Sequence, residues 1–268
     1  LNEVGALPGL SMQFVVQTLA TVFLASLRIG AFLIASPFFG GSSVPLQVRI
    51  IMAVLLGVFV ASNVSAPTWQ SFDAMTGVQV VLTELMIGIG SGLILTIWFS
   101  AALLAGEKIA ASAGLGFAAQ MDPDSGGQTP VVSKIFSLFL TVLFLSWDGH
   151  IVVLHAILDT YQFLPVGNVP NLKVLITGGL STAGSMFAAA TIIMLPVTGF
   201  LVAINLAIGV ISRSSPQMNL FAVGFPISMI VVFVLLYMWV DVLGYSLTDL
   251  SQSGVDSVRS VLGKMTNG

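Results

Sequence analysis

The sequence predicts an all-α, membrane-associated protein built from helical hairpins, with about six long hydrophobic helices that contain kinks. Of its 268 residues, 56% are hydrophobic and only 7% are charged, whereas a soluble domain has about 25% charged residues. So little charge cannot cover a soluble surface, which places the chain among membrane proteins. Cysteine is absent, which excludes disulfides. The small net charge of −3 does not indicate a nucleic-acid partner.

Apolar stretches, each near or above the length of about 20 residues that crosses a bilayer, follow one another along the chain. They are residues 12–36, 46–64, 75–105, 135–158, 174–212 and 218–245. Segments rich in glycine, proline and polar residues separate them, at 36–45, 65–73, 106–134, 159–173 and 212–217. No repeat with a period of about 20–50 residues is present, so we interpret residues 1–268 as a single domain.

The stretch 174–212 has no charge and is too long for one straight span. Pro196 lies inside it and removes one backbone hydrogen bond. Either one long bent helix or two shorter helices fits this segment.

Small residues recur at helical spacing, which allows helix backbones to approach closely. Gly88 and Gly92 form a GxxxG pattern, and 178–190 is composed almost entirely of small residues. Two interpretations stay open: ordinary packing within the chain, or contact with other subunits.

Charged residues interrupt or flank the apolar stretches. A charge at the bilayer centre costs at least about 2.5–3.5 kcal/mol, so each one needs a partner or water. Arg28 and Arg49 lie within about two turns of a Gly/Pro-rich segment that their side chains can reach. The alternatives for the charged residues are a proton or ion pathway, a salt bridge to another subunit, and a helix that does not lie in lipid. The charged residues are Arg28, Arg49, Glu84, Asp148 and Asp241.

The stretch "WDGH" is the sharpest of these interruptions. On one helix, Asp148 and His155 would share a face two turns apart, about 10 Å, which is long for two ligands of one metal. His150 and His155 also lack the i, i+4 spacing of helical zinc sites. A carboxylate–histidine hydrogen bond or a helix break at Gly149 is favoured over a metal site. No catalytic motif is present, so we expect neither an enzyme nor a cofactor.

Residues 106–133 carry the motif "GEKIAASAGLGFAAQMDPDSGGQTPVVS", and residues 114–134 form a long polar interruption at the centre of an apolar chain. With "RIGAFLIASPFFGGSSVPLQVRIIMAV" (28–54), "DGHIVVLHAILDTYQFLPVG" (148–167) and "SRSSPQMNLFAVGFPI" (212–227), this motif resembles the FliR family of flagellar type III export-gate proteins. Relatives of that family, such as SctT, serve virulence injectisomes. The four motifs occur in order and the resemblance covers nearly the whole chain.

The resemblance implies a single all-helical subunit of a closed export channel built mainly from FliP and FliQ subunits. An FlhB-like subunit docks on this gate, and unfolded flagellar proteins pass through it. It implies a place in the bacterial inner membrane at the flagellar basal body, with helices lifted largely out of the bilayer plane.

The resemblance also implies a plug at the closed constriction, formed by the central segment of about 106–134. The positions carried over to the plug are Gly114, Gly116, Phe117, Met121, Asp122, Pro123, Gly126 and Gln128. The residues expected at subunit contacts are Arg28, Arg49, Gly88, Gly92, Arg213, Pro216, Gln217 and Asn219.

Three alternatives stay open at this point. The chain fits an injectisome export subunit as well as a flagellar one. A small-solute secondary transporter would suit broken helices around a polar site, but the chain lacks internal repeats. In a purely structural interpretation, the chain nucleates gate assembly and the central segment is only a connector.

Overall fold

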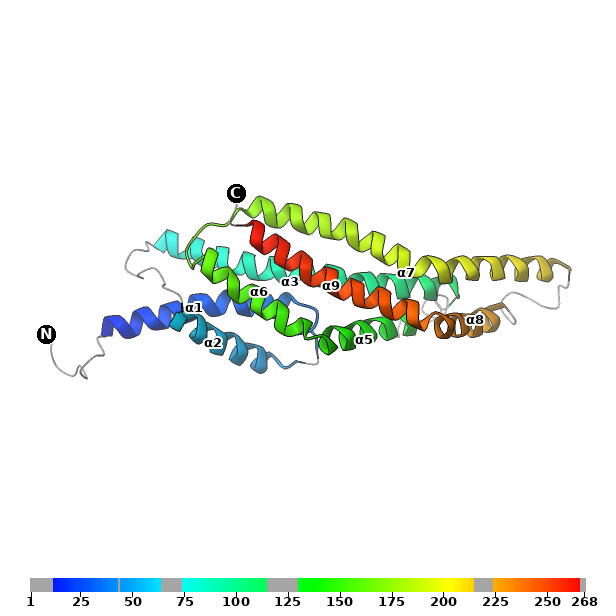
Figure 1. Cartoon of the computed structure of the whole chain (residues 1–268), viewed down its shortest axis with the longest axis horizontal. Coiled ribbons are helices and arrows are strands. Elements are labelled where there is room, and N and C mark those ends of the chain that lie inside the picture. The colour runs from blue at the N-terminus through cyan, green and yellow to red at the C-terminus, as the bar shows by residue number, and fades with distance from the viewer. Residues whose placement is uncertain (1–11, 43, 64–73, 115–129, 215–223, 266–268) are drawn as a thin grey trace. The chain divides into compact units, whose positions relative to one another are not determined.

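In the computed structural model, all regular secondary structure of the described residues is helical. The structure describes residues 12–42, 44–63, 74–114, 130–214 and 224–265. In chain order (Figure 1), the helices are α1 (Met12–Ala35), α2 (Leu46–Asn63), α3 (Ala74–Ser112), α5 (Val131–Ser146), α6 (Gly149–Phe163), α7 (Leu172–Ser214), α8 (Phe225–Met238) and α9 (Val240–Lys264). The predicted all-α class is confirmed.

Four helices, α1, α2, α3 and α7, are long and apolar enough to cross a membrane. Two further pairs, α5 with α6 and α8 with α9, pass the same test only when each bent pair is taken as one span, which gives up to six spans. The expected set of about six long hydrophobic helices with kinks is therefore confirmed in length and composition.

The predicted stretch 135–158 is not one continuous helix, because this region forms the two helices α5 and α6. Trp147 and Asp148 separate them, and Asp148 has φ of 60°, a left-handed conformation through which a helix does not continue. Gly149 follows at a position where a Cβ would lie only 2.6 Å from the Phe144 ring. The helix break, one of the two alternatives offered at Gly149, is confirmed.

The last predicted stretch, 218–245, is also wrong in its extent. α8 ends at Met238, and α9 bends away from it by 72° and continues to Lys264. A search for long apolar runs does not detect α9, because half of its surface is polar. Its buried side chains recur at helical spacing instead, which is the pattern of an amphipathic helix. They include Leu247, Leu250, Val255, Val258, Val261 and Leu262.

The described residues divide by packing into two compact units. The first contains α1, α2, residues 74–96 of α3, residues 150–163 of α6, and short parts of α7 and α9. Within it, α1 and α2 lie side by side and their packing forms one wall of the unit (Figure 1). Its core is closed by fully buried large side chains, which are Ile29, Phe32, Leu33, Ile87, Ile157 and Tyr161.

The second unit contains residues 97–112 of α3, α5, residues 182–214 of α7, α8 and the first part of α9. Phe144 packs edge-on against Phe99 and Trp147, at centroid distances of 5.3 and 6.2 Å. The Trp147 indole N–H donates to the Ser251 hydroxyl at 3.3 Å, which fixes α9 against the end of α5. α3, α7 and α9 contribute residues to both units, and a single domain over 1–268 stays a prediction.

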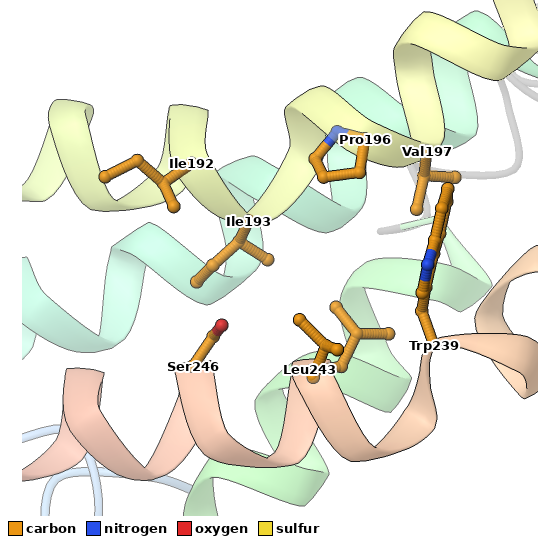
Figure 2. A pocket seen from close by; sticks show the side chains of 8 residues that line it. Ile192, Ile193, Pro196, Val197, Trp239, Leu243 and Ser246 are labelled. Carbon is orange, nitrogen blue, oxygen red and sulfur yellow. The ribbon is translucent and has the colours of Figure 1, made fainter.

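The segment 174–212 forms one helix rather than two, since α7 runs without interruption from Leu172 to Ser214 with Pro196 inside it. Beside Pro196 lies a cavity of about 50 Å³. Figure 2 shows Trp239 and the Ser246 hydroxyl of α9 pointing toward α7 across this space. The cavity has room for water rather than for a substrate.

Candidate functional site

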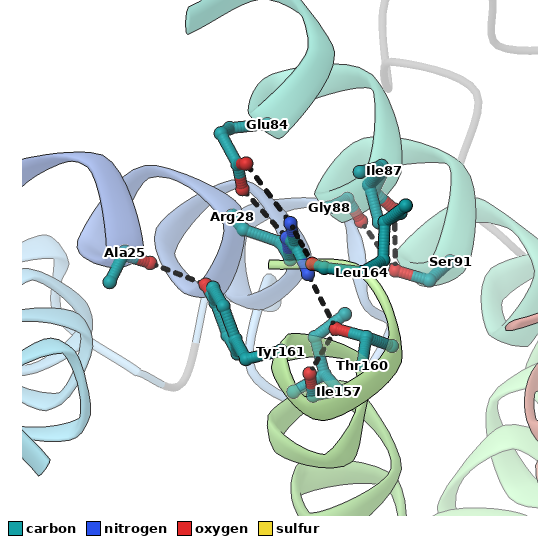
Figure 3. Close-up of polar contacts among 10 residues, drawn as sticks. All are labelled: Ala25, Arg28, Glu84, Ile87, Gly88, Ser91, Ile157, Thr160, Tyr161 and Leu164. Carbon is teal, nitrogen blue, oxygen red and sulfur yellow. Dashed lines mark hydrogen bonds and ion pairs between the residues drawn. The ribbon is translucent and has the colours of Figure 1, made fainter. Parts of the chain in front are cut away.

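The residue with the most polar contacts in the described chain is Arg28 of α1, whose side chain is fully buried. Its Nε donates to Glu84 Oε2 at 2.7 Å and its Nη2 to Glu84 Oε1 at 3.0 Å. Nη1 donates to Thr160 Oγ1 at 2.8 Å, and Nη2 also donates to the Leu164 carbonyl at 3.1 Å. Figure 3 shows this cluster joining α1, α3 and α6.

The N–H groups at the edge of the Arg28 guanidinium are hydrogen-bonded, and an aromatic ring covers its flat face. Its Cζ lies 4.1 Å from the centroid of the Tyr161 ring, a cation–π distance. The Tyr161 hydroxyl in turn donates to the Ala25 carbonyl at 2.7 Å. The Thr160 hydroxyl donates a hydrogen bond to the Ile157 carbonyl at 2.6 Å. Each polar group of the cluster is therefore satisfied by another helix or by its own, which burial of a charge requires.

Two glycines allow α3 to approach α1 closely enough for the bidentate Arg28–Glu84 pair. A Cβ on Gly88 would clash with the backbone carbonyl of Arg28. A Cβ on Gly92 would lie 2.7 Å from the Ala35 Cβ and 2.9 Å from the Phe32 carbonyl. The GxxxG pattern therefore serves packing within the chain, which was the first of the two interpretations of the sequence. A contact of Gly88, Gly92 or Arg28 with another subunit stays a prediction.

Arg49 reaches the Gly/Pro-rich segment before α2, as the sequence predicted. Its Nη2 donates to the Gly41 carbonyl and to the Val44 carbonyl, the latter at 2.8 Å. Arg213, by contrast, lies exposed in the last turn of α7. Pro216, Gln217 and Asn219 lie outside the described residues, and all subunit contacts expected at these positions stay predictions.

Of the predicted plug positions, only Gly114 is described. It has φ of 81°, and its N–H donates to the Ala111 carbonyl at 3.0 Å, so it ends the turn that follows α3. The positions outside the described residues are Gly116, Phe117, Met121, Asp122, Pro123, Gly126 and Gln128.

The described ends of this central segment share a stem in the second unit. A Cβ on Gly106 of α3 would lie 2.5 Å from the Ser133 Cα of α5. Only a glycine permits these backbones to pass so closely, and Ser133 is fully buried at the contact. The segment therefore leaves from and returns to one tightly packed pair of helices.

The charged and histidine residues around Asp148 do not form a catalytic or metal-binding cluster among the described residues. No group of three His, Asp or Glu side chains comes together there. Asp148 lies in the break before α6, so it does not share a helix with His155. The His150 ring contacts the Phe38 ring at a centroid distance of 6.3 Å.

Sequence reasoning identified Arg28 and Glu84 as buried charges that need partners, but it did not pair them with each other. The two are 56 residues apart, and opposite charge inside apolar stretches was the available signal. Thr160 and Tyr161 were not identified, because a hydroxyl near a helix end carries no such signal by itself.

Comparison with known proteins gives consistent similarities. The family described as "Bacterial export proteins, family 1" matches residues 19–254. A "Flagellar biosynthetic protein FliR" of Escherichia coli (strain K12) is 32% identical over 210 residues, covering 76% of this chain and 78% of the relative. The protein of the same name in Pectobacterium carotovorum is 31% identical over 204 residues, with the same coverage. The one from Bacillus subtilis (strain 168) is 26% identical over 254 residues, covering 94% of this chain and 98% of the relative.

Proposed function

Since the chain belongs to the FliR family of bacterial export proteins, which takes part in flagellar biosynthesis, we propose that it is a subunit of the flagellar export gate. In this proposal it forms a closed channel with FliP-like and FliQ-like subunits in the inner membrane at the basal body. Unfolded flagellar proteins cross this channel, and an FlhB-like subunit docks on it. The flagellar names of the relatives favour this system over an injectisome.

The observation that supports an assembly most directly is the length of α7. Its 43 residues extend about 64 Å, against about 30 Å of bilayer hydrocarbon. A tilt of about 40°, the upper end of the usual range, still leaves about 49 Å along the membrane normal. Large apolar side chains are exposed along its whole length: Ile176, Leu180, Phe187, Ile192, Leu195, Phe200, Leu206 and Val210.

Lipid covers at most part of that apolar face, so the rest needs protein. α7 also presents glycines at which an added Cβ would meet nothing, including Gly184, Gly199 and Gly209. A neighbouring helix can approach the backbone closely at such positions. Both features support the view that α7 is covered by other subunits of the gate.

Co-expression with the neighbouring open reading frames, followed by purification in mild detergent, tests this proposal. We expect FliP-like and FliQ-like proteins to copurify in a discrete complex. We expect the chain expressed alone to aggregate, because its apolar face is uncovered. A monodisperse, stable monomer without partners would count against the gate, and transport of a labelled ion or metabolite by that monomer would indicate a solute transporter.

The second part of the proposal assigns the central segment to the channel. Irregular backbone at membrane depth persists only where protein buries it or where it lines a watery cavity. The α3–α5 stem holds both described ends of this segment in one place. We infer from the family resemblance that residues between them occlude the resting channel, with Phe117 and Met121 as apolar bulk in the seal and Asp122 at its wet edge.

A deletion within 114–126 that preserves assembly is expected to open the resting gate to small ions. The readout is ion conductance, or entry of a small impermeant dye, across the inner membrane of cells carrying the variant. Blue native gels establish that the complex is still formed. An assembled, non-leaking and secretion-competent gate after the deletion would make this segment a simple connector.

A further inference from the structure

A groove in the first unit has a composition that the export proposal does not explain. It has a volume of about 320 Å³ and lies between α1, α2 and α3. Its walls are apolar and include Leu27, Ile34, Ile50 and Val54, while Arg49 is the one charged residue that lines it. Ligand pockets for small molecules are of this size, and they combine apolar walls with a few placed polar groups.

Arg49 is held at the groove in a way that leaves its charge unneutralised. Nη2 donates to the Gly41 and Val44 carbonyls, which fixes the side chain in position. Nε is buried and has no hydrogen-bond partner. Within the described part of the chain, the recorded ion pair is Arg28–Glu84, and no carboxylate pairs with Arg49. Arg49 thus lines the groove with a positive charge that no described carboxylate offsets, and an anionic ligand would complement it.

The position of Arg49 along α2 matches the depth of a lipid headgroup. α2 has 18 residues and is about 27 Å long, close to the hydrocarbon thickness of about 30 Å. Arg49 lies in its first turn, so it is at the membrane interface when α2 spans the bilayer. From Leu46 to Val54 the groove follows α2 for about 12 Å toward the bilayer interior.

The surface around the groove is apolar, which suits contact with lipid. α2 is the least buried of the four span candidates. Its outward side chains are almost all apolar and include Val48, Ile51, Leu55, Val58 and Phe59. A single hydrocarbon chain is thin and flexible enough to lie in an apolar groove of this volume.

We propose that this groove is a specific lipid site, in which Arg49 binds the phosphate of an anionic phospholipid and one acyl chain lies between α1, α2 and α3. The site depends on the placement of residues in this unit and not on the role of the chain in export. A gate that exports normally without the lipid would therefore leave the proposed function intact.

Photolabelling of the complete complex tests this proposal. The complex, co-expressed with its partners, is reconstituted in phosphatidylcholine vesicles. These contain a trace of phosphatidylglycerol or of phosphatidylcholine, each with the same photoreactive acyl chain. We expect phosphatidylglycerol to label peptides covering 26–34 and 46–54 at least about fivefold more than phosphatidylcholine, the ratio that one arginine near anionic headgroups provides. This comparison needs no variant, so it is informative whether or not a substitution folds.

Arg49→Gln should reduce that preference to about one, while Lys173→Gln, which removes an exposed cation from the start of α7, should leave it unchanged. Assembly of both variants is checked on blue native gels. Equal labelling by the two lipids in the unmodified complex would overturn the proposal. So would a preference that survives Arg49→Gln, or crosslinks from Ile50→Cys to a partner protein in place of lipid labelling.

Discussion

Replacement of Glu84 by alanine is expected to lower the free energy of unfolding by about 3–5 kcal/mol, because it leaves Arg28 charged and without its carboxylate. Both side chains are fully buried, so water cannot take the place of the lost partner. A guanidinium does not release its proton in proteins, and Arg28 therefore cannot escape the penalty by becoming neutral. The measurement is the fraction of intact complex that survives heating or urea, compared with the unmodified chain.

The double replacement Arg28→Met with Glu84→Leu separates loss of a contact from burial of an unpaired charge. It removes both charges and keeps comparable volume, so it should regain at least half of the lost stability. Recovery stays incomplete because the Leu164 carbonyl loses the N–H that Arg28 donates to it. If the single and double variants were equally unstable, the charge of Arg28 would not be the cause.

Gly88→Ala is expected to be nearly as damaging, although it adds only one methyl group. The new Cβ clashes with the Arg28 carbonyl, a backbone atom that cannot turn aside. α3 must then move away from α1, which costs about 1–3 kcal/mol for overpacking and also stretches the Arg28–Glu84 pair. Recovery of complex on a blue native gel should fall sharply, and Gly88→Leu should abolish it.

Gly77→Ala provides a matched control in the same helix. A Cβ on Gly77 meets nothing within 4 Å, and alanine favours a helix over glycine by up to about 1 kcal/mol. This variant should therefore be recovered as well as the unmodified chain, or slightly better. Equal behaviour of the Gly77 and Gly88 variants would show that α1 and α3 are not in close contact in the assembled protein.

The sequence predicted strongly apolar helices well and the amphipathic helix poorly. α1, α2 and α3 begin within a residue of the predicted stretches, because long apolar runs bounded by proline, glycine and polar residues are strong signals. α9 was predicted only in its first turns, since an amphipathic helix passes no test for an apolar span. A helix break was expected at Gly149 as one of two alternatives, whereas the left-handed residue is Asp148, since a positive φ at a non-glycine residue depends on tertiary packing.

The sequence predicted the buried charged residues of the candidate site, but it did not predict which of them pair with each other. Burial of a charge in an apolar stretch identified Arg28 and Glu84 as residues in need of partners. Their pairing depends on which helices cross, and that is a property of the whole fold. For the same reason, the GxxxG pattern predicted close packing at Gly88 but left open whether the neighbour was α1 or another subunit.

The Arg28 cluster also imposes an order on biosynthesis. Arg28 leaves the ribosome 56 residues before Glu84 and 132 residues before Thr160. At about 5–20 residues per second, Glu84 is made about 3–11 s after Arg28, and Thr160 about 7–26 s after it. An unpaired arginine inside the bilayer is expensive, so until Glu84 is made we expect α1 to stay where the Arg28 side chain can reach water. α1 therefore gains all its contacts in the cluster only after both α3 and α6 have been made, and a ribosome that stalls before α6 leaves Arg28 without Thr160 and Tyr161.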